Sequence, residues 1–341
     1  MEPGKCLLRA GAIGSSFFSE PRVTQAGRLG MKWNEIKDEK TPTMNNSRLF
    51  PGFDAQDVST TGATIRTLRA GSGPPLLLLH GYPQTHVIWH KIARQLTRRF
   101  TVVLTDLRGY GDSSKPDGGL RHANYSFRAM AQDQLEVMRL MGYQQFYVGS
   151  HDRGARTAHR LCLDYPKAVR KVALLEIVPT LRMYRDTSKE FATKYMWWFF
   201  LIQKAPLPEH MIGADPNFFL DEHFEVQNGT PGALTAEALQ EYRRCFCTPE
   251  TIHATCEDFR AAAEIDLEMD EADEKAGHKI EAPVLALWGA KGAVGKLWNV
   301  LEVWNQHANA PAQGRALDGG HYLAEEQPEE VLKEFLRFFS E

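Results

Sequence analysis

Short apolar runs alternate with segments of helical spacing along most of the chain. The runs at 74–81 (PPLLLLHG), 100–109 (FTVVLTDLRG) and 145–151 (QFYVGSH) are largely apolar, as in strands that are buried on both faces. A similar run follows at 171–178 (KVALLEIV), and 63–70 (ATIRTLRA) is predicted to form an earlier strand. The chain therefore contains at least one sheet whose strands are separated by long connections.

The segments between these strands have the apolar spacing of helices. Residues 86–96 show this spacing, and 125–142 form an amphipathic pattern that ends at a glycine. Another helix is predicted to follow the strand at 145–151 and to end at the proline of LDYP. We therefore expect an α/β fold, with a mostly parallel sheet and helices on both faces.

The alternation stops at residues 180–281, which are aromatic, interrupted by prolines and mostly helical in pattern. It resumes with a strand at 282–290, a helix near 296–308, a short strand at 314–320 and a final helix at 328–339. A helical segment inserted between two strands of a parallel sheet is expected to cover the ends of the strands, where open α/β sheets place their sites.

The predicted organisation has three parts. Residues 48–179 and 282–341 form the α/β core, residues 180–281 form a helical cap, and residues 1–47 form an extension. The extension is poor in acidic residues over much of its length, contains several arginines and lacks a secretory apolar region. It is predicted to be disordered or to act as a mitochondrial transit peptide. We expect a cytoplasmic protein, or a mitochondrial one if the extension is a targeting signal.

Composition excludes some classes of function. The net charge of -3 provides no basic patch for nucleic acid. No apolar stretch is long enough to span a membrane, and the run YMWWFFLI at 195–202 is better explained as a cap helix or core segment. Neither nucleic acid nor membrane is therefore an expected partner.

Five cysteines occur at irregular spacing, at Cys6, Cys162, Cys245, Cys247 and Cys256. Their odd number favours free thiols in a reducing compartment. A metal site at the last three is the alternative, but CxxC spacing and a matched histidine pair are both missing. We expect no metal and no organic cofactor.

The corner GSHDRGAR at 149–156 carries the strongest candidate chemistry. Asp152 stands between small residues where a strand ends and a helix begins, which is the form of a nucleophile elbow. Serine is the usual occupant and attacks acyl carbon. A carboxylate instead attacks an sp³ carbon that bears a leaving group, and it forms an ester that water must then cleave. The alternative role for Asp152 is that of a helix N-cap.

Ester cleavage needs a base, and His321 in DGGHYL follows the last predicted strand in the order nucleophile, acid, histidine. Glu176 interrupts the apolar run KVALLEIV and is the predicted acid that orients this histidine. The alternative for His321 is an ordinary surface histidine, and the alternative for Glu176 is a structural ion pair. The backbone N–H groups of Arg153 and Tyr82 are the predicted oxyanion hole.

These segments resemble a known family. LLLLHGYPQTHVIWH, DLRGYG, HDRGAR and GGHYL are similar to motifs of the haloacetate dehalogenases of the α/β-hydrolase fold, which include the fluoroacetate dehalogenases. The likeness covers about residues 49 to 340, and HDRGAR is specific, because related epoxide hydrolases usually carry tryptophan after the nucleophile. The resemblance implies hydrolytic dehalogenation of small 2-haloacids through an aspartyl ester, without a cofactor. It also suggests a homodimer.

The resemblance also assigns residues that bind the substrate. Arg153 and Arg156 correspond to the pair that grips the substrate carboxylate, which would explain two cations in the first turn of a helix, where the dipole disfavours them. The alternative is two solvated surface arginines. Trp197, Trp198 and Tyr242 correspond to the halide-binding side chains, and their alternative is aromatic core.

Trp197 departs from the family pattern, because it stands where a histidine is expected. The change alters the small pocket that selects fluoride, so we expect chloro- and bromoacid turnover to be less affected than defluorination. Glu176 stands where aspartate is more usual.

Two other functions fit parts of the pattern. An epoxide hydrolase would use the same nucleophile and two phenols, Tyr242 with Tyr184 or Tyr195, although a neutral epoxide gives the two arginines nothing to bind. A non-catalytic protein that binds a small carboxylate is the third hypothesis, and the complete set of nucleophile, acid and histidine argues against it.

Overall fold

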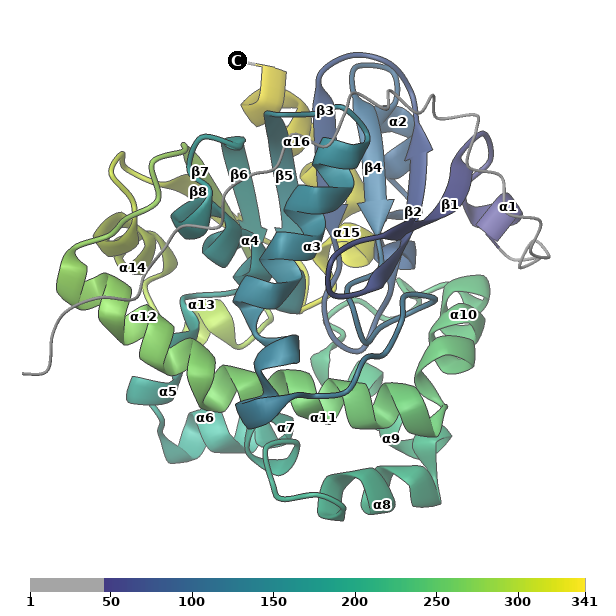
Figure 1. Cartoon of the computed structure of the whole chain (residues 1–341), viewed down its shortest axis with the longest axis vertical. Helices are drawn as coiled ribbons and strands as arrows, with labels where there is room; N and C mark the ends of the chain where they lie inside the picture. Colours follow the sequence, from purple (N-terminus) through teal and green to yellow (C-terminus); the bar gives the residue numbers. More distant parts are fainter. Residues whose placement is uncertain (1–45, 341) are drawn as a thin grey trace, which may run out of the picture. The chain divides into compact units, whose positions relative to one another are not determined.

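An eight-stranded sheet forms the centre of residues 46–340, which are the residues that the computed structural model describes (Figure 1). Its strands are β1 (Asp54–Ser59), β2 (Thr64–Ala70), β3 (Pro75–Leu79), β4 (Thr101–Thr105), β5 (Phe146–His151), β6 (Val169–Leu175), β7 (Val284–Gly289) and β8 (Gln313–Leu317). Their order is β1-β2-β4-β3-β5-β6-β7-β8. The pairs β1–β2 and β2–β4 are antiparallel, and the other five pairs are parallel. The predicted fold class is confirmed.

The central strands are the ones that the apolar runs predict. Every residue of β4 and β5 is buried, because helices cover both faces of the sheet there. Strand β1 was not predicted, since only Val58 of its six residues is buried and its sequence, DAQDVS, is largely polar. It lies at the edge of the sheet, where charged side chains are common.

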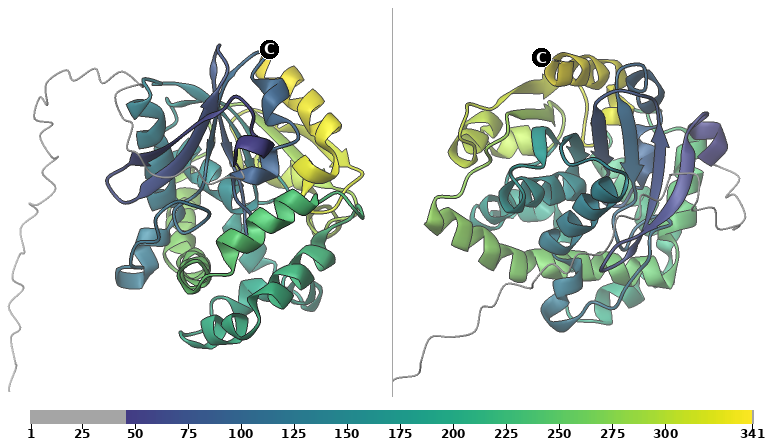
Figure 2. Two further views of the ribbon diagram at one scale, coloured as in Figure 1. Left: turned by 90° about the vertical axis from the view of Figure 1, so that its right-hand side faces the viewer. Right: turned by 45° about the horizontal axis from the view of Figure 1, so that its top comes forward.

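Helices α3 (Phe127–Leu140), α4 (Asp152–Asp164) and α14 (Val300–His307) lie on one face of the sheet, and α2 (Ala93–Leu96) and α16 (Pro328–Ser340) lie on the other. Figure 2 shows the yellow α16 and the teal α3 on opposite sides of the strands. The remaining elements outside the 180–281 segment are α1 (Asn46–Leu49), η2 (His86–Trp89), η3 (Leu120–Tyr125), α13 (Val294–Leu297) and α15 (Leu323–Glu326).

Two predicted helices are broken, and the predictions of continuous helices were wrong there. Residues 86–96 form the 3₁₀ turn η2 and then α2, and the buried Asp106 carboxylate fixes η2 by accepting the backbone N–H of His86 at 2.8 Å. Residues 296–308 are interrupted by the extended Trp298, after which Asn299 caps α14 by accepting the N–H of Glu302 at 3.4 Å.

Eight helices follow β6 before the chain returns as β7, and we refer to them as the cap helices. They are α5 (Thr180–Arg185), α6 (Lys189–Lys194), α7 (Met196–Phe200), α8 (Leu207–Ala214), α9 (Pro216–Gln227), α10 (Ala236–Phe246), α11 (Pro249–Ala263) and α12 (Ile265–Ala276). Figure 1 shows them beyond one end of the strands. Because residues 46–340 fall within one compact unit, the division into core and cap domains stays a prediction.

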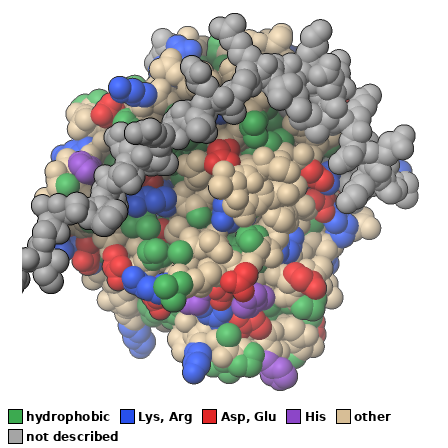
Figure 3. All heavy atoms as spheres, in the orientation of Figure 1, with side chains coloured by type: hydrophobic (Ala, Val, Ile, Leu, Met, Phe, Trp, Pro, Cys, Tyr) green, Lys and Arg blue, Asp and Glu red, His purple; other side chains and the backbone are tan. Residues whose placement is uncertain are grey.

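Other predictions concern regions or properties that the structure leaves open. The extension at 1–47 lies outside the described residues, apart from the start of α1. No described helix has the length and hydropathy that a membrane crossing requires. Figure 3 shows basic and acidic side chains mixed over the described part of one face. Cys162, Cys245, Cys247 and Cys256 are free thiols. The homodimer and the cellular location remain predictions.

The first turn of α4 depends on glycine at residue 154. A Cβ atom there would lie 2.2 Å from the carbonyl oxygen of His80. We expect Gly154→Ala to lower the free energy of unfolding by about 1–3 kcal/mol in urea denaturation, because α4 must move away from β3. Gly213→Ala in α8 is the control, because no atom lies within 4 Å of its added methyl group. A Gly154→Ala variant as stable as the unsubstituted protein would contradict the close packing.

Candidate active site

Asp152 occupies a strained corner between β5 and α4. Its φ is +44°, and only Arg121, His122 and Glu176 share a positive φ among the non-glycine residues between 46 and 340. Such strain persists where the surrounding structure enforces it, often at functional sites. The backbone N–H of Tyr82 donates to Asp152 Oδ2 at 3.1 Å, so one of the two predicted oxyanion-hole donors points at this carboxylate.

The electrostatic surroundings keep the buried Asp152 carboxyl ionised. Burial by itself would raise its pKa, but the interactions with His321 and with the guanidinium groups of Arg156 and Arg153 are stronger in sum, and the pKa lies below its ordinary value. A buried carboxylate that is ionised at neutral pH can act as a nucleophile.

His321 lies in the loop between β8 and α15, and a neighbouring carboxylate holds this loop in place. Glu326 accepts the backbone N–H groups of Gly320 at 2.6 Å and Tyr322 at 2.8 Å. The carbonyl of His321 accepts a hydrogen bond from His151 Nε2 at 2.8 Å, and the two rings lie 4.6 Å apart. Burial lowers the pKa of His321 well below its ordinary value, so the ring is neutral and able to accept a proton.

Glu176 follows β6 as Asp152 follows β5, and its φ is +57°. Its Oε2 accepts the N–H of Gly289 at 2.6 Å, and burial raises its pKa to about 8. No hydrogen bond joins Glu176 to His321 in the described part of the chain. Glu176 Oε1 and His321 Nδ1 are both buried without a partner. The orienting role of Glu176 therefore stays a prediction.

The structure separates the two arginines of the HDRGAR motif. Arg153 pairs with Asp258 of α11 through two nitrogens, one of which is Nε at 2.9 Å from Oδ2. Its guanidinium also lies over the rings of Phe127, at 4.7 Å, and Phe259, at 4.2 Å. The charge of Arg153 is thus compensated within the protein, and only Nη1 is buried without a partner.

Arg156 has no such compensation. Its Nη1 donates to the carbonyl of Val178 and the hydroxyl of Thr180, both at 3.1 Å, and its guanidinium lies 4.6 Å from the Trp198 ring. None of the ion pairs found among residues 46–340 includes Arg156, and its Nε is buried without a partner. Burial lowers the pKa of Arg156 to about 10, although the charge of Asp152 opposes this effect. A buried cation with only neutral acceptors is suited to an anionic ligand.

The predicted halide-binding side chains are brought together only in part. Trp197 and Trp198 are both buried in α7, and Trp198 lies over Arg156. Tyr242 of α10 lies elsewhere, with its hydroxyl beside Glu325 and its ring 5.4 Å from Phe224. No contact among the described residues joins Tyr242 to either tryptophan.

Phe259 occupies the space near the site that the phenol was expected to fill. Its ring lies 6.2 Å from that of Trp198 and 5.1 Å from that of Tyr82. Because phenylalanine carries no donor, this side of the site is apolar.

Comparison with known proteins identifies the family to which this chain belongs. Residues 74–328 match the model of a family described as the α/β-hydrolase fold. The chain belongs to the α/β-hydrolase fold family. A crystal structure of an α/β hydrolase from Nostoc sp. PCC 7120 is 56% identical, with a TM-score of 0.83, and the match covers 84% of this chain and 98% of that chain.

Two curated relatives have reported activities. A fluoroacetate dehalogenase from Burkholderia sp. is 43% identical to this α/β hydrolase, over 84% of this chain and 95% of that protein. The resemblance to the haloacetate dehalogenases is thereby confirmed. A soluble epoxide hydrolase from Corynebacterium sp. (strain C12) is 30% identical, over 82% of this chain and 94% of that protein.

A pocket of about 220 Å³ reaches His321 from the surface of this α/β hydrolase. Lys194, Lys291 and Lys296 line it, and no acidic side chain does. Lys194 pairs with Glu190 and Lys291 with Asp318, both at 3.1 Å, so the positive charge of this approach to the site is partly offset.

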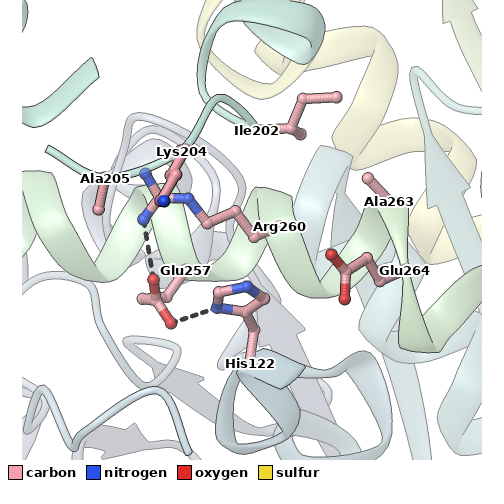
Figure 4. Close-up of a pocket in the computed structure, with 8 residues that line it drawn as sticks. All are labelled: His122, Ile202, Lys204, Ala205, Glu257, Arg260, Ala263 and Glu264. Carbon is pink, nitrogen blue, oxygen red and sulfur yellow. Dashed lines mark hydrogen bonds and ion pairs between the residues drawn. The ribbon is translucent and has the colours of Figure 1, made fainter. Parts of the chain in front are cut away.

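The largest pocket described, of about 530 Å³, lies elsewhere, beside α11. Figure 4 shows Glu257 between Arg260 and His122, bonded to the first at 2.8 Å and to the second at 2.6 Å. The charged side chains of this pocket are largely paired with one another. Neither Asp152 nor His321 lines the pocket.

Several residues of the site were not predicted. Asp258 and His223 come from cap helices whose packing the sequence pattern did not reveal, and Glu326 holds the histidine loop. The two adjacent acidic residues in CEDFRAAA, Glu257 and Asp258, were a usable signal for a buried carboxylate there. His151 precedes the nucleophile and could have been noted from its position alone.

The raised pKa of Glu176 predicts how stability depends on pH. Between pH 4.5, its ordinary pKa, and about 8, the unfolded carboxyl is ionised while the folded one retains its proton. The unfolded state then binds fewer protons, so the free energy of unfolding falls as pH rises, by roughly 1.4 kcal/mol per pH unit at most. Glu176→Gln should abolish this contribution.

The measurement is urea denaturation of Glu176→Gln and the unsubstituted protein across this pH range. Their difference in unfolding free energy should shift in favour of the variant as pH rises. Glu190→Gln, at an exposed helix position, is the control. A difference that does not change with pH would contradict the burial of a protonated Glu176.

Proposed function

We propose that this α/β hydrolase is a haloacid dehalogenase, which converts small 2-haloacids such as haloacetates into 2-hydroxyacids and halide. One observation carries the proposal. The strained, buried carboxylate of Asp152 lies within electrostatic range of Arg156, a buried cation that forms no ion pair at contact distance in the described part of the chain. An incoming carboxylate would supply that partner. The Burkholderia fluoroacetate dehalogenase, 43% identical, supports the same activity.

In the first step, Arg156 binds the substrate carboxylate and places the halogen-bearing carbon against Asp152. The guanidinium plane suits a carboxylate, and the unpartnered Nη1 of Arg153 can add a further donor. Asp152 attacks the carbon in line, a carbon–oxygen bond forms, and the halide leaves with the electron pair of the broken bond. The product of this step is an ester of Asp152.

In the second step, His321 takes a proton from water, and the resulting hydroxide attacks the ester carbonyl carbon of Asp152. The N–H groups of Tyr82 and Arg153 would stabilise the oxyanion. Collapse releases the hydroxyacid and restores the carboxylate, with one proton and one halide ion released overall. Glu176 would stabilise the imidazolium, because a cation beside it favours its ionised form. The indole N–H groups of Trp197 and Trp198 are the proposed halide donors.

An epoxide hydrolase is the second candidate function. Tyr184 and Tyr195 are both close enough to Arg156 to interact with it electrostatically, and the Tyr184 hydroxyl is buried without a partner. Two such phenols could protonate an epoxide oxygen. Arg156 favours the first candidate, because a neutral epoxide leaves its charge uncompensated.

Isotope transfer tests the proposed nucleophile. In a single turnover of chloroacetate in ¹⁸O-water, we expect the heavy oxygen in the peptide that contains Asp152, because water attacks the ester at the aspartyl carbonyl carbon. Mass spectrometry of the digested protein provides the measurement. Asp152→Asn should release no chloride in the same time, while Asp164→Asn, at a surface ion pair, should behave as the unsubstituted protein. Label found only in glycolate would show direct attack by water on the substrate.

Arg156→Met tests carboxylate binding. We expect kcat/KM for chloroacetate to fall by about 10²-fold or more, since charge-assisted hydrogen bonds are lost. The neutral analogue chloroacetamide should be much less affected. The free energy of unfolding should change little, because the substitution removes a buried charge but also one of the cations near Asp152. Arg128→Met, at an exposed pair with Asp164, is the control.

Equal losses for the acid and the amide would contradict this role of Arg156. Hydrolysis of styrene oxide to its diol, without halide release from any haloacid, would favour the epoxide hydrolase.

A further inference from the structure

His223 of the cap helix α9 packs against Tyr82 in the loop that faces Asp152. The side chain is 3% exposed, and its ring lies 4.3 Å from that of Trp197 and 5.0 Å from that of Tyr82. Tyr82 is the residue whose N–H donates to Asp152. The charge of Asp152 also acts on His223, and His223 in turn acts on His321. The imidazole is thus part of the wall that surrounds the proposed reaction centre.

The hydrogen bonds of His223 determine which nitrogen can donate. With the Gln227 amide oriented so that its Nε2 lies 2.8 Å from Nε2 of His223, the imidazole Nε2 is the acceptor, because an amide nitrogen only donates. The proton of a neutral ring then lies on Nδ1. Burial lowers the pKa of His223 to about 3, which keeps the ring neutral. Nδ1 is buried and has no hydrogen-bond partner among residues 46–340. The result is an N–H donor without an acceptor.

An unpaired buried donor is costly, and a group bound during turnover would satisfy it. The ring of Trp197, one of the proposed halide donors, lies 4.3 Å away, so a halide bound by that indole would be the candidate acceptor. The sequence carries tryptophan at residue 197, where the related dehalogenases are expected to have a histidine donor. His223 brings an imidazole to the same indole from a different helix.

We propose that His223 donates its Nδ1–H to the departing halide and thereby contributes to the choice of halogen. The inference rests on the proposed dehalogenase function and adds a residue that the sequence did not indicate. A hydrogen bond gains most strength with the smallest and most basic halide, so this donor assists fluoride more than chloride or bromide. Trp197 does not provide the imidazole donor that the related dehalogenases are expected to have at that position. His223 would provide an imidazole donor from α9 instead.

Three substitutions separate a donor from a packing role. His223→Phe keeps a ring against Trp197 and Tyr82 but removes the N–H. His223→Asn retains an N–H donor close to the place of Nδ1, because its amide nitrogen is also bonded to Cγ. His223→Gln is the matched control, because its amide nitrogen extends toward the Nε2 end of the ring.

Rates of fluoride and chloride release from fluoroacetate and chloroacetate provide the first measurement. We expect His223→Phe to lower kcat for fluoroacetate by about 10- to 100-fold and to lower kcat for chloroacetate less, so that the ratio of the two changes. His223→Asn should recover a substantial part of this ratio, and His223→Gln should not. An unchanged ratio in His223→Phe would overturn the proposal, as would equal ratios in the Asn and Gln variants.

Halide binding provides a second measurement that does not require turnover. Titration with sodium fluoride or sodium chloride, followed by tryptophan fluorescence, should show binding to the unsubstituted protein that is about 10-fold weaker in His223→Phe. Urea denaturation of each variant checks that the fold is retained. Halide binding that depends on His223 without any haloacid turnover would refute the proposed function but keep this inference. Binding that is the same in all variants would refute the inference alone.

Discussion

The site depends on keeping an ionised carboxylate out of water at the carboxyl end of a central strand of the sheet. Burial disfavours the charged form of Asp152, and the positive charges around it reverse that preference. The backbone is also forced into a left-handed conformation there, which projects the side chain above the strand ends. Without the surrounding cations burial would raise the pKa of the carboxyl, and a neutral acid is a poor nucleophile.

Arg153 and Arg156 have different electrostatic roles in the site. Arg153 is bound to Asp258 between two aromatic rings, and it ties helix α11 of the cap to the first turn of α4. Arg156 meets only neutral acceptors, so its charge is available for a ligand. A motif in which both arginines are expected to grip the substrate thus contains one mainly structural cation and one that awaits an anion. The different roles of Arg153 and Arg156 follow from their different contacts and not from their spacing in the sequence.

The core could be predicted from the sequence because its strands are continuous apolar runs and its corner has a local steric signature. Asp152 and Glu176 were identified in this way, and both have the positive φ that follows from a sharp turn at the end of a strand. Edge strand β1 escaped notice because it buries one side chain, and its short polar pattern resembles a loop.

The cap was less predictable, because contacts there join helices that are far apart in the chain. Aromatic residues fill this region, so spacing alone could not show that Phe259 rather than Tyr242 lies beside Arg153 and Trp198. The same holds for His223, whose neighbours Trp197 and Tyr82 come from two other segments. The neighbours of Phe259 and His223 can be assigned only from the tertiary structure.

The three lysines around the opening beside His321 affect departure as well as arrival. A positive rim concentrates negatively charged molecules at the mouth and speeds their encounter with the protein, most strongly in dilute salt. The same field acts on a hydroxyacid and a halide ion on their way out. Added salt would weaken this field for the incoming and the outgoing anions alike.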